Sequence, residues 1–148
     1  MPNPPPQSGG GWRLVPYISA SGRCPVREFL RDLKRSNPRA AADFYELWRP
    51  RFEKHGPFVV GPPHWEGLGD ELYEIRWCGK CRIYCSVEPI RRVLMYMGVV
   101  KRWRRFDPEH RRTCDNRRAD VRSKDYDDQK REYIYHGVNQ KRRENGFT

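Results

Sequence analysis

The sequence predicts an α+β domain built on a small, mainly antiparallel sheet. Three observations lead to this class: the spacing of apolar residues switches from helical to alternating along the chain, the predicted order is strand, two helices, three strands and helix, and 148 residues suit one domain. We divide the chain into a leader rich in proline and glycine (1–11), a folded domain (12–121) and a charged extension (122–148) that we expect to be partly disordered.

A strand and a helical hairpin are predicted for the first half of the domain. Residues 12–18 (WRLVPYI) are rich in aromatic and branched side chains, and Pro16 favours a sheet edge or a strand end because it lacks an N–H. The next helix has Pro25 at its first position. Its apolar face consists of Val26, Phe29, Leu30 and Leu33. A second helix starts at the N-cap Asn37, and Pro50 is expected to end or kink it. We expect this hairpin to pack on one face of the sheet.

Three strands and a helix are predicted for the second half. Glycine and proline in residues 55–63 indicate a loop. From Glu71 the apolar spacing becomes two, which predicts strands in ELYEIRW, CRIYCSV and RRVLMYMGVV. Asp107 is suited to cap a helix that has Pro108 at its first position.

The pairing of the first two of these strands is set by the length of the loop between them. A two-residue loop, Gly79-Lys80, would mix apolar and polar residues on both faces. A three-residue loop, Cys78-Gly79-Lys80, would pair Trp77 with Cys81 and Arg76 with Arg82. It gathers on one face Tyr73, Ile75, Trp77, Cys81, Ile83, Cys85 and Val87. Since one buried face requires such segregation, we predict the three-residue loop.

The cysteines of this hairpin allow three interpretations. Cys78 and Cys81 have the C-x-x-C spacing of zinc and redox motifs. However, no second C-x-x-C completes a set of four zinc ligands, and no helix N-terminus lowers a thiol pKa here. We therefore interpret Cys81 and Cys85 as core residues and Cys78 as a loop residue, and we expect no metal site.

The composition points to a polyanionic partner. Thirty Lys and Arg residues against nineteen Asp and Glu give a formal net charge of +11, which favours nucleic acid over an anionic membrane surface. No apolar run approaches the ~18 residues of a membrane helix. The N-terminus lacks the charged and apolar regions of a signal peptide. Five cysteines without a secretory context suit a reducing compartment, so we expect a cytoplasmic protein that does not bind membranes.

A polar patch is predicted on the face of the sheet that the hairpin leaves uncovered. It consists of Glu74, Arg76, Arg82 and Tyr84. One explanation is a solvated outer face. The other is catalytic: a carboxylate, two guanidinium groups and a phenol supply the groups with which a ribonuclease activates a 2′-hydroxyl, stabilises a phosphorane and protonates a 5′-oxygen.

The segment KRWRRF follows the last strand and has two interpretations as well. Its four cations and two aromatic rings suit phosphate contacts and base stacking on single-stranded RNA. They are Lys101, Arg102, Trp103, Arg104, Arg105 and Phe106. Alternatively the segment is a basic connection whose Trp103 and Phe106 fold into the core.

His64, just before the second strand, is either a solvated loop residue or an acid or base near neutral pH; His55 and His110 are weaker candidates.

Three segments resemble RelE/HigB-type toxins of bacterial type II toxin–antitoxin systems, most closely the phage-derived HigB-like branch. GLGDELYEIRWCGKCRIYC resembles the central hairpin of that branch, SGRCPVREFLRDL its first helix start, and GVVKRWRRFDPEH its basic segment. They occur in the family's order, and the resemblance covers roughly residues 12–120.

The resemblance implies a compact fold like that of microbial ribonucleases, which enters the ribosomal A site and cuts mRNA without a metal or cofactor. By position, Arg82, Arg76 and Glu74 match the polar strand residues of the family, and Lys101 and Arg102 match its cationic pair. Our hypothesis is that the two arginines stabilise the phosphorane. Glu74 or His64 would assist the 2′-hydroxyl, and the general acid stays unassigned.

The expected partners are mRNA on the ribosome and a cognate antitoxin with a helix-turn-helix. The basic segment would bind RNA, with Trp103 or Phe106 stacking on a base and Tyr84 beside it. The alternative function is that of a non-catalytic basic nucleic-acid-binding module, or of a gyrase-directed toxin like those in the same superfamily.

Overall fold

A five-stranded sheet forms the centre of the computed structural model, which describes residues 11–101 and 105–128. The strand order is β1-β5-β4-β3-β2, with β1 parallel to β5 and the other neighbours antiparallel. The strands are β1 (Arg13–Pro16), β2 (Trp65–Gly69), β3 (Leu72–Trp77), β4 (Cys81–Glu88) and β5 (Arg92–Val100). The α+β class and the mainly antiparallel sheet are thus as predicted. Pro16 is the last residue of an edge strand, as its missing N–H requires.

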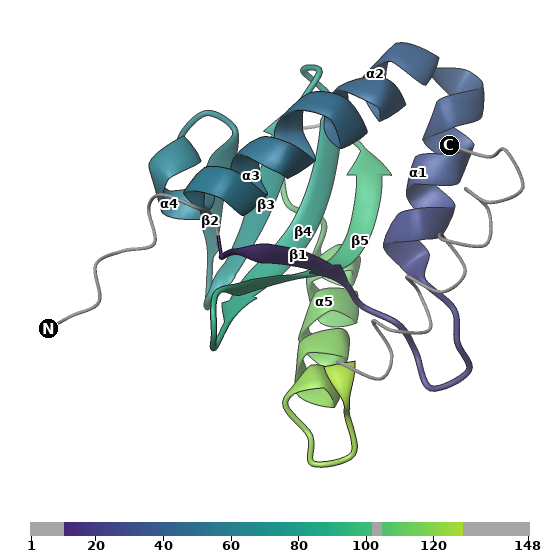
Figure 1. Ribbon diagram of the computed structural model, residues 1–148. Coiled ribbons are helices and arrows are strands. Elements are labelled where there is room, and N and C mark those ends of the chain that lie inside the picture. The colour runs from purple at the N-terminus through teal and green to yellow at the C-terminus, as the bar shows by residue number, and fades with distance from the viewer. Residues whose placement is uncertain (1–10, 102–104, 129–148) are drawn as a thin grey trace, which may run out of the picture.

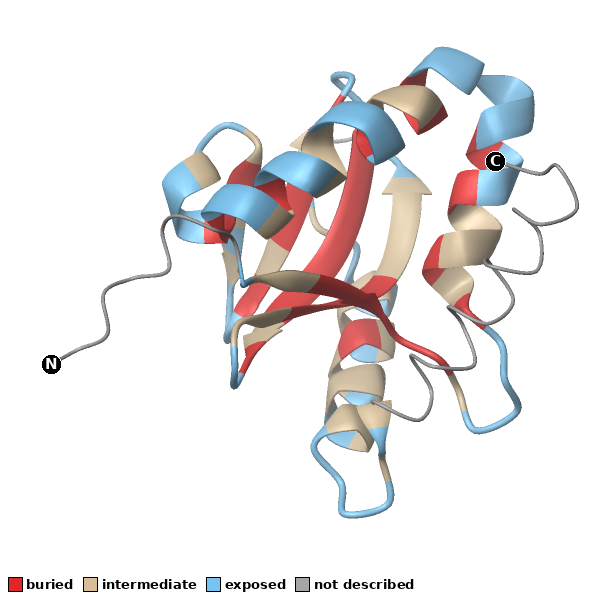
Figure 2. Ribbon diagram, viewed as in Figure 1, coloured by how far each residue is buried: buried red, intermediate tan, exposed pale blue. Residues whose placement is uncertain are grey.

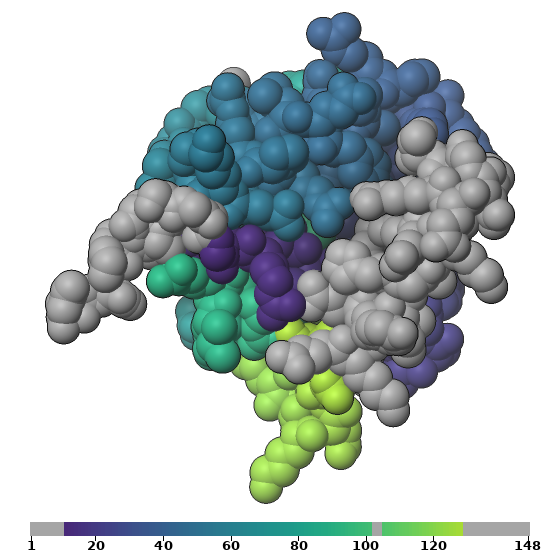
Figure 3. Space-filling model, viewed as in Figure 1, coloured from purple at the N-terminus to yellow at the C-terminus, as the bar shows by residue number. Residues whose placement is uncertain are grey.

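The N-terminal helices form a layer on one face of the sheet (Figures 1 and 2). They are α1 (Pro25–Ser36), α2 (Pro38–Asp43), the π-helix η1 (Phe44–Trp48), α3 (Arg49–His55) and α4 (Pro57–Val60). Val26, Leu30 and Leu33 of α1 are buried in one cluster with Ile75, Ile83 and other inward-facing strand residues. The space-filling view of Figure 3 shows α2 and α3 as a continuous surface over the sheet. The predicted helical hairpin on one face is confirmed.

Of the two predicted outcomes at Pro50, an end or a kink, the structure shows no helix end. The Asn37 side chain caps α2 by accepting a hydrogen bond from the Ala40 N–H, as expected. The chain then widens into η1 and continues as α3, with Pro50 in its first turn. A wider turn before a proline gives the proline ring room and leaves fewer broken backbone hydrogen bonds. The chain therefore stays helical from α2 through η1 into α3.

Two further elements were not predicted from the sequence. The segment 57–60 forms the short helix α4 within the expected loop, and β2 precedes the three predicted strands. β2 pairs with β3 at the edge of the sheet, with a register shift between Gly67 and Gly69. Two glycines in five residues hide the alternating pattern of this strand.

The helix α5 (Pro108–Val121) lies on the other face of the sheet. Asp107 caps it through a 2.8 Å hydrogen bond from the Glu109 N–H, as predicted. Its Cys114 is fully buried in a second cluster with residues of the sheet, among them Tyr84, Leu94 and Tyr96. The prediction that this face is uncovered is therefore wrong around Tyr84, because α5 packs there.

The first residues of the predicted extension pack on the domain. After α5, the Tyr126 ring stacks on Tyr17 with centroids 5.9 Å apart, and Asp128 pairs with Arg92. The leader up to residue 10 and the extension from 129 onward lie outside the described residues. No helix in the described ranges combines the length and apolar character that crossing a membrane requires.

Candidate functional site

The β3–β4 hairpin has the three-residue loop that the sequence predicts. Trp77 pairs with Cys81, and Arg76 with Arg82. Cys78 and Gly79 adopt positive φ angles of 54° and 74°, which close this short loop. The two arginines are consequently cross-strand neighbours on the face opposite the N-terminal helices.

The hairpin cysteines lie as the core interpretation expects. Cys81 and Cys85 are buried, whereas Cys78 is exposed in the loop, and all are free thiols. Burial raises the pKa of the Cys81 thiol to about 11, so its thiolate form is disfavoured. Within the described residues no three His, Cys, Asp or Glu side chains converge as metal ligands.

A buried ion pair lies at the centre of the predicted polar patch. Arg82 Nε is 3.4 Å from Glu74 Oε1, and the two side chains are only 9% and 7% exposed. Neither of these two atoms makes a hydrogen bond within the described part of the chain. The Arg76 side chain is more accessible. Its Nη1 lies 3.1 Å from Glu66 Oε1, and its Nε lies 4.0 Å from Glu74 Oε2. The patch is therefore a chain of alternating charges with its deepest pair removed from water, and the solvated-face explanation does not apply to Glu74 and Arg82.

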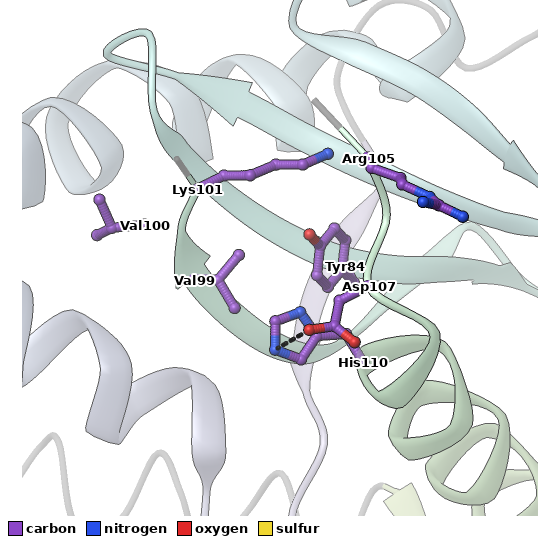
Figure 4. Close-up of a pocket in the computed structure, with 7 residues that line it drawn as sticks. All are labelled: Tyr84, Val99, Val100, Lys101, Arg105, Asp107 and His110. Atoms are coloured by element: carbon purple, nitrogen blue, oxygen red, sulfur yellow. Dashed lines mark ion pairs between the residues drawn. The ribbon is translucent and has the colours of Figure 1, made fainter. Parts of the chain in front are cut away.

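A pocket of about 250 Å³ opens beside this patch, between the middle of β4, the end of β5 and the start of α5 (Figure 4). It is lined by Tyr84, Val99, Val100, Lys101, Arg105, Asp107 and His110. Figure 4 shows the Tyr84 ring between Lys101 and His110. His110 Nε2 lies 4.0 Å from Asp107 Oδ2, three residues earlier on α5. The pocket thus combines two cations, a phenol and a carboxylate–imidazole pair.

The electrostatics of the pocket follow from burial and from the nearby ion pair. Burial, together with the charge of Glu74, raises the pKa of Tyr84, so the phenol stays neutral and can donate a hydrogen bond. Burial also lowers the pKa of Lys101; Glu74 opposes this, whereas Arg82 and Arg76 add to it. Among the described residues neither Lys101 nor Arg105 forms an ion pair. Both cations are available to an anionic ligand.

His64 lies away from this pocket. Its ring packs on Trp48 with centroids 3.9 Å apart, and its Nδ1 is 3.0 Å from the Arg76 carbonyl oxygen. Trp48 belongs to the apolar cluster under the N-terminal helices, on the opposite face of the sheet. The hypothesis that His64 assists a reaction beside Arg82 therefore finds no support in its position.

The basic segment is only partly within the described residues. Arg102, Trp103 and Arg104 lie outside them. Phe106 packs on Tyr84 with centroids 4.6 Å apart, and the Arg111 guanidinium lies over its ring at 4.8 Å. For Phe106 this is the core packing that the alternative interpretation of the segment expects.

Asp107 was not selected as a site residue from the sequence, and His110 was only a weaker candidate. Their spacing of three residues at a helix start is a signal that was available, because such residues share one face of a helix. Their proximity to Tyr84 was not, because it depends on how α5 crosses the sheet. The Tyr84 and His110 ring centroids are 6.1 Å apart.

Fold and site together define a small, basic α+β protein with a cationic pocket between the strands β4 and β5 and the start of α5. Compared with models of known protein families and with curated protein sequences, the chain matches none of them. What the pocket can do is therefore inferred from its residues.

Proposed function

We propose that this chain is the toxin of a bacterial type II toxin–antitoxin system and acts as an endoribonuclease on ribosome-bound mRNA. In the proposed reaction the 2′-hydroxyl attacks the adjacent phosphate, no metal takes part, and the 5′-oxygen leaves. The observation that carries the proposal is the pocket: Lys101 and Arg105, which form no ion pair within residues 11–101 and 105–128, lie beside a neutral phenol and an imidazole. These groups can bind a phosphodiester and move its protons without a cofactor.

The burial of Arg82 and Glu74 changes the roles proposed for them. Because each neutralises the other out of contact with water, the pair adds no net charge to the pocket, and in this proposal neither side chain contacts the substrate. Arg76, a third exposed, and Lys101 are the accessible cations nearest to them. Lys101 keeps its proposed role as a ligand of the phosphate.

The order of elements supports the toxin class. The resemblance implies a strand, a helical hairpin, an antiparallel hairpin bearing the polar residues, and a basic segment leading into a helix. The described elements follow this order. A cognate antitoxin with a helix-turn-helix is the partner that this class implies, and the cytoplasm is the compartment.

Induced expression with mapping of mRNA 5′ ends tests the proposal. We expect growth arrest and new, in-frame 5′ ends confined to translated messages. Lys101→Met should lower the cleavage frequency at least tenfold. The matched control is Lys54→Met, which removes an exposed lysine on α3 and should cleave like the wild type. Arrest without new RNA ends would contradict the proposal.

A non-catalytic nucleic-acid-binding or gyrase-directed role is the second candidate. It is favoured by the burial of Glu74 and Arg82, which leaves fewer groups of the predicted patch for catalysis. Induced expression would then give DNA breaks or no cleavage at all. A neighbouring short reading frame encoding a helix-turn-helix protein favours a toxin.

A further inference from the structure

The pocket offers three side chains that can hold or move a proton: Tyr84, Lys101 and His110. Tyr84 is 1% exposed, and its burial disfavours loss of its proton, so it is a poor acid. Lys101 is suited to the phosphate itself, since it presents a positive charge without an acidic partner among the described residues. His110 differs from both because its side chain is 34% exposed and imidazole exchanges protons near neutral pH.

The surroundings of His110 suit an acid. Asp107 Oδ2 lies 4.0 Å from His110 Nε2 and restricts the position of the ring. Facing it from the sheet are the neutral Tyr84 on β4 and the cation Lys101 after β5, and Arg105 lines the same pocket. Lys101 and His110 thus line one pocket from either side of the Tyr84 ring, so a phosphodiester that contacts Lys101 and extends along the pocket reaches His110.

We propose that His110 is the general acid of the ribonuclease reaction and that Asp107 is its positioning residue. This inference rests on the proposed function. The 2′-oxygen forms a bond to phosphorus and gives its proton to water, the bond from phosphorus to the 5′-oxygen breaks, and His110 protonates the departing oxygen. The products are a 2′,3′-cyclic phosphate and a 5′-hydroxyl.

A sulfur substitution at the leaving group tests this role directly. Synthetic mRNA carrying the cleavage site from the 5′-end map is placed on ribosomes, with either the normal 5′-oxygen or a bridging sulfur at the scissile bond. A thiolate leaves without being protonated, so a general acid is needed only for the oxygen substrate. We expect His110→Gln to slow cleavage of the oxygen substrate at least 100-fold and to cleave the sulfur substrate within about threefold of the wild type.

Two further variants separate the positioning role from general damage to the fold. Asp107→Asn should slow only the oxygen substrate, about tenfold, because asparagine caps the helix as well as aspartate does. His55→Gln alters an exposed histidine on α3 and should leave both rates unchanged. Equal defects of His110→Gln on both substrates, or none, would overturn the inference. A wild type that cleaves neither substrate would instead overturn the proposed function.

Discussion

The Glu74–Arg82 pair removes two charges from water in the middle of a small sheet. Such burial costs several kcal/mol per ion, and the attraction between the partners offsets this cost only while both are present. Their closest atoms are 3.4 Å apart without a hydrogen bond between them, so the offset is incomplete. This pair is therefore a poor source of stability.

Removing one partner of this pair should be far more damaging than removing an exposed arginine from the same hairpin. We expect Arg82→Met to lower the free energy of unfolding by about 3–5 kcal/mol, because buried Glu74 loses its closer counter-charge and keeps only Arg76, which is 4.0 Å away and partly exposed. Adding Glu74→Gln should restore much of this loss. The measurement is urea-induced unfolding followed by circular dichroism.

Arg76→Met is the matched control, since Arg76 sits directly across the hairpin but is a third exposed. Its loss should be at most about 1 kcal/mol. Similar losses of stability for Arg82→Met and Arg76→Met would show that burial of the Glu74–Arg82 pair does not determine the size of the loss.

Part of the candidate site follows from residues alone. Alternation along two strands and the length of one loop determined that Arg76 and Arg82 are neighbours, and the register confirms it. Which of the two arginines is buried was not predictable, because burial depends on what covers the face. His110 was undervalued for a similar reason: its distance from Tyr84 is a property of tertiary packing.

At the scale of elements, α1 packs closely across β5 at a single glycine. A Cβ added to Gly98 would lie 2.2 Å from Cδ2 and 2.5 Å from Cγ of Phe29, well inside van der Waals contact. A phenyl ring cannot yield there without moving the helix. The approach of the N-terminal layer to the sheet therefore depends on the missing side chain.

Gly98→Ala should consequently destabilise the protein, although alanine normally suits a strand better than glycine. We expect a loss of about 1–3 kcal/mol in the free energy of unfolding, from overpacking against Phe29. Gly67→Ala in β2 is the control, because the nearest neighbour of its Cβ, on Tyr73, is at an ordinary 3.7 Å. Thermal and urea unfolding compare the two variants; equal stability of Gly98→Ala and the wild type would mean that α1 shifts at no cost.

The elements with clear periodicity or caps were the ones predicted well. α1 has its apolar residues on one face, and Asn37 and Asp107 cap helices as expected. One failure has a local cause: two glycines disguised β2. At Pro50 a π-turn carried the chain on without a helix end. α5 is largely charged, so nothing in its composition indicated that it covers the sheet; Cys114 is its one fully buried side chain among the described residues.

At the scale of the whole molecule, free thiols are buried within the sheet and in the segments that pack on it. Cys24 precedes α1, Cys81 and Cys85 lie in β4, and Cys114 lies in α5 on the opposite face. Burial raises the pKa of Cys24 to about 11 and that of Cys114 to about 12, and it raises the pKa of Cys85 well above its usual value. The native fold thus holds these groups protonated where an unfolded chain would release their protons.

This difference should make the protein lose stability in mild alkali. Because folding raises the thiol pKa, the contribution of the buried thiol to the free energy of unfolding is fully present below pH 9, the ordinary pKa of a thiol. It is lost as the pH rises toward the pKa in the folded state.

Cys114→Ala removes one such group. Between pH 8 and pH 10.5 its free energy of unfolding should fall by about 2 kcal/mol less than that of the wild type. Guanidinium unfolding with reductant present measures both. Cys78→Ala, which removes the exposed loop thiol, should fall as steeply as the wild type. Parallel curves for Cys114→Ala and the wild type would mean that this thiol ionises as readily in the fold as in the unfolded chain.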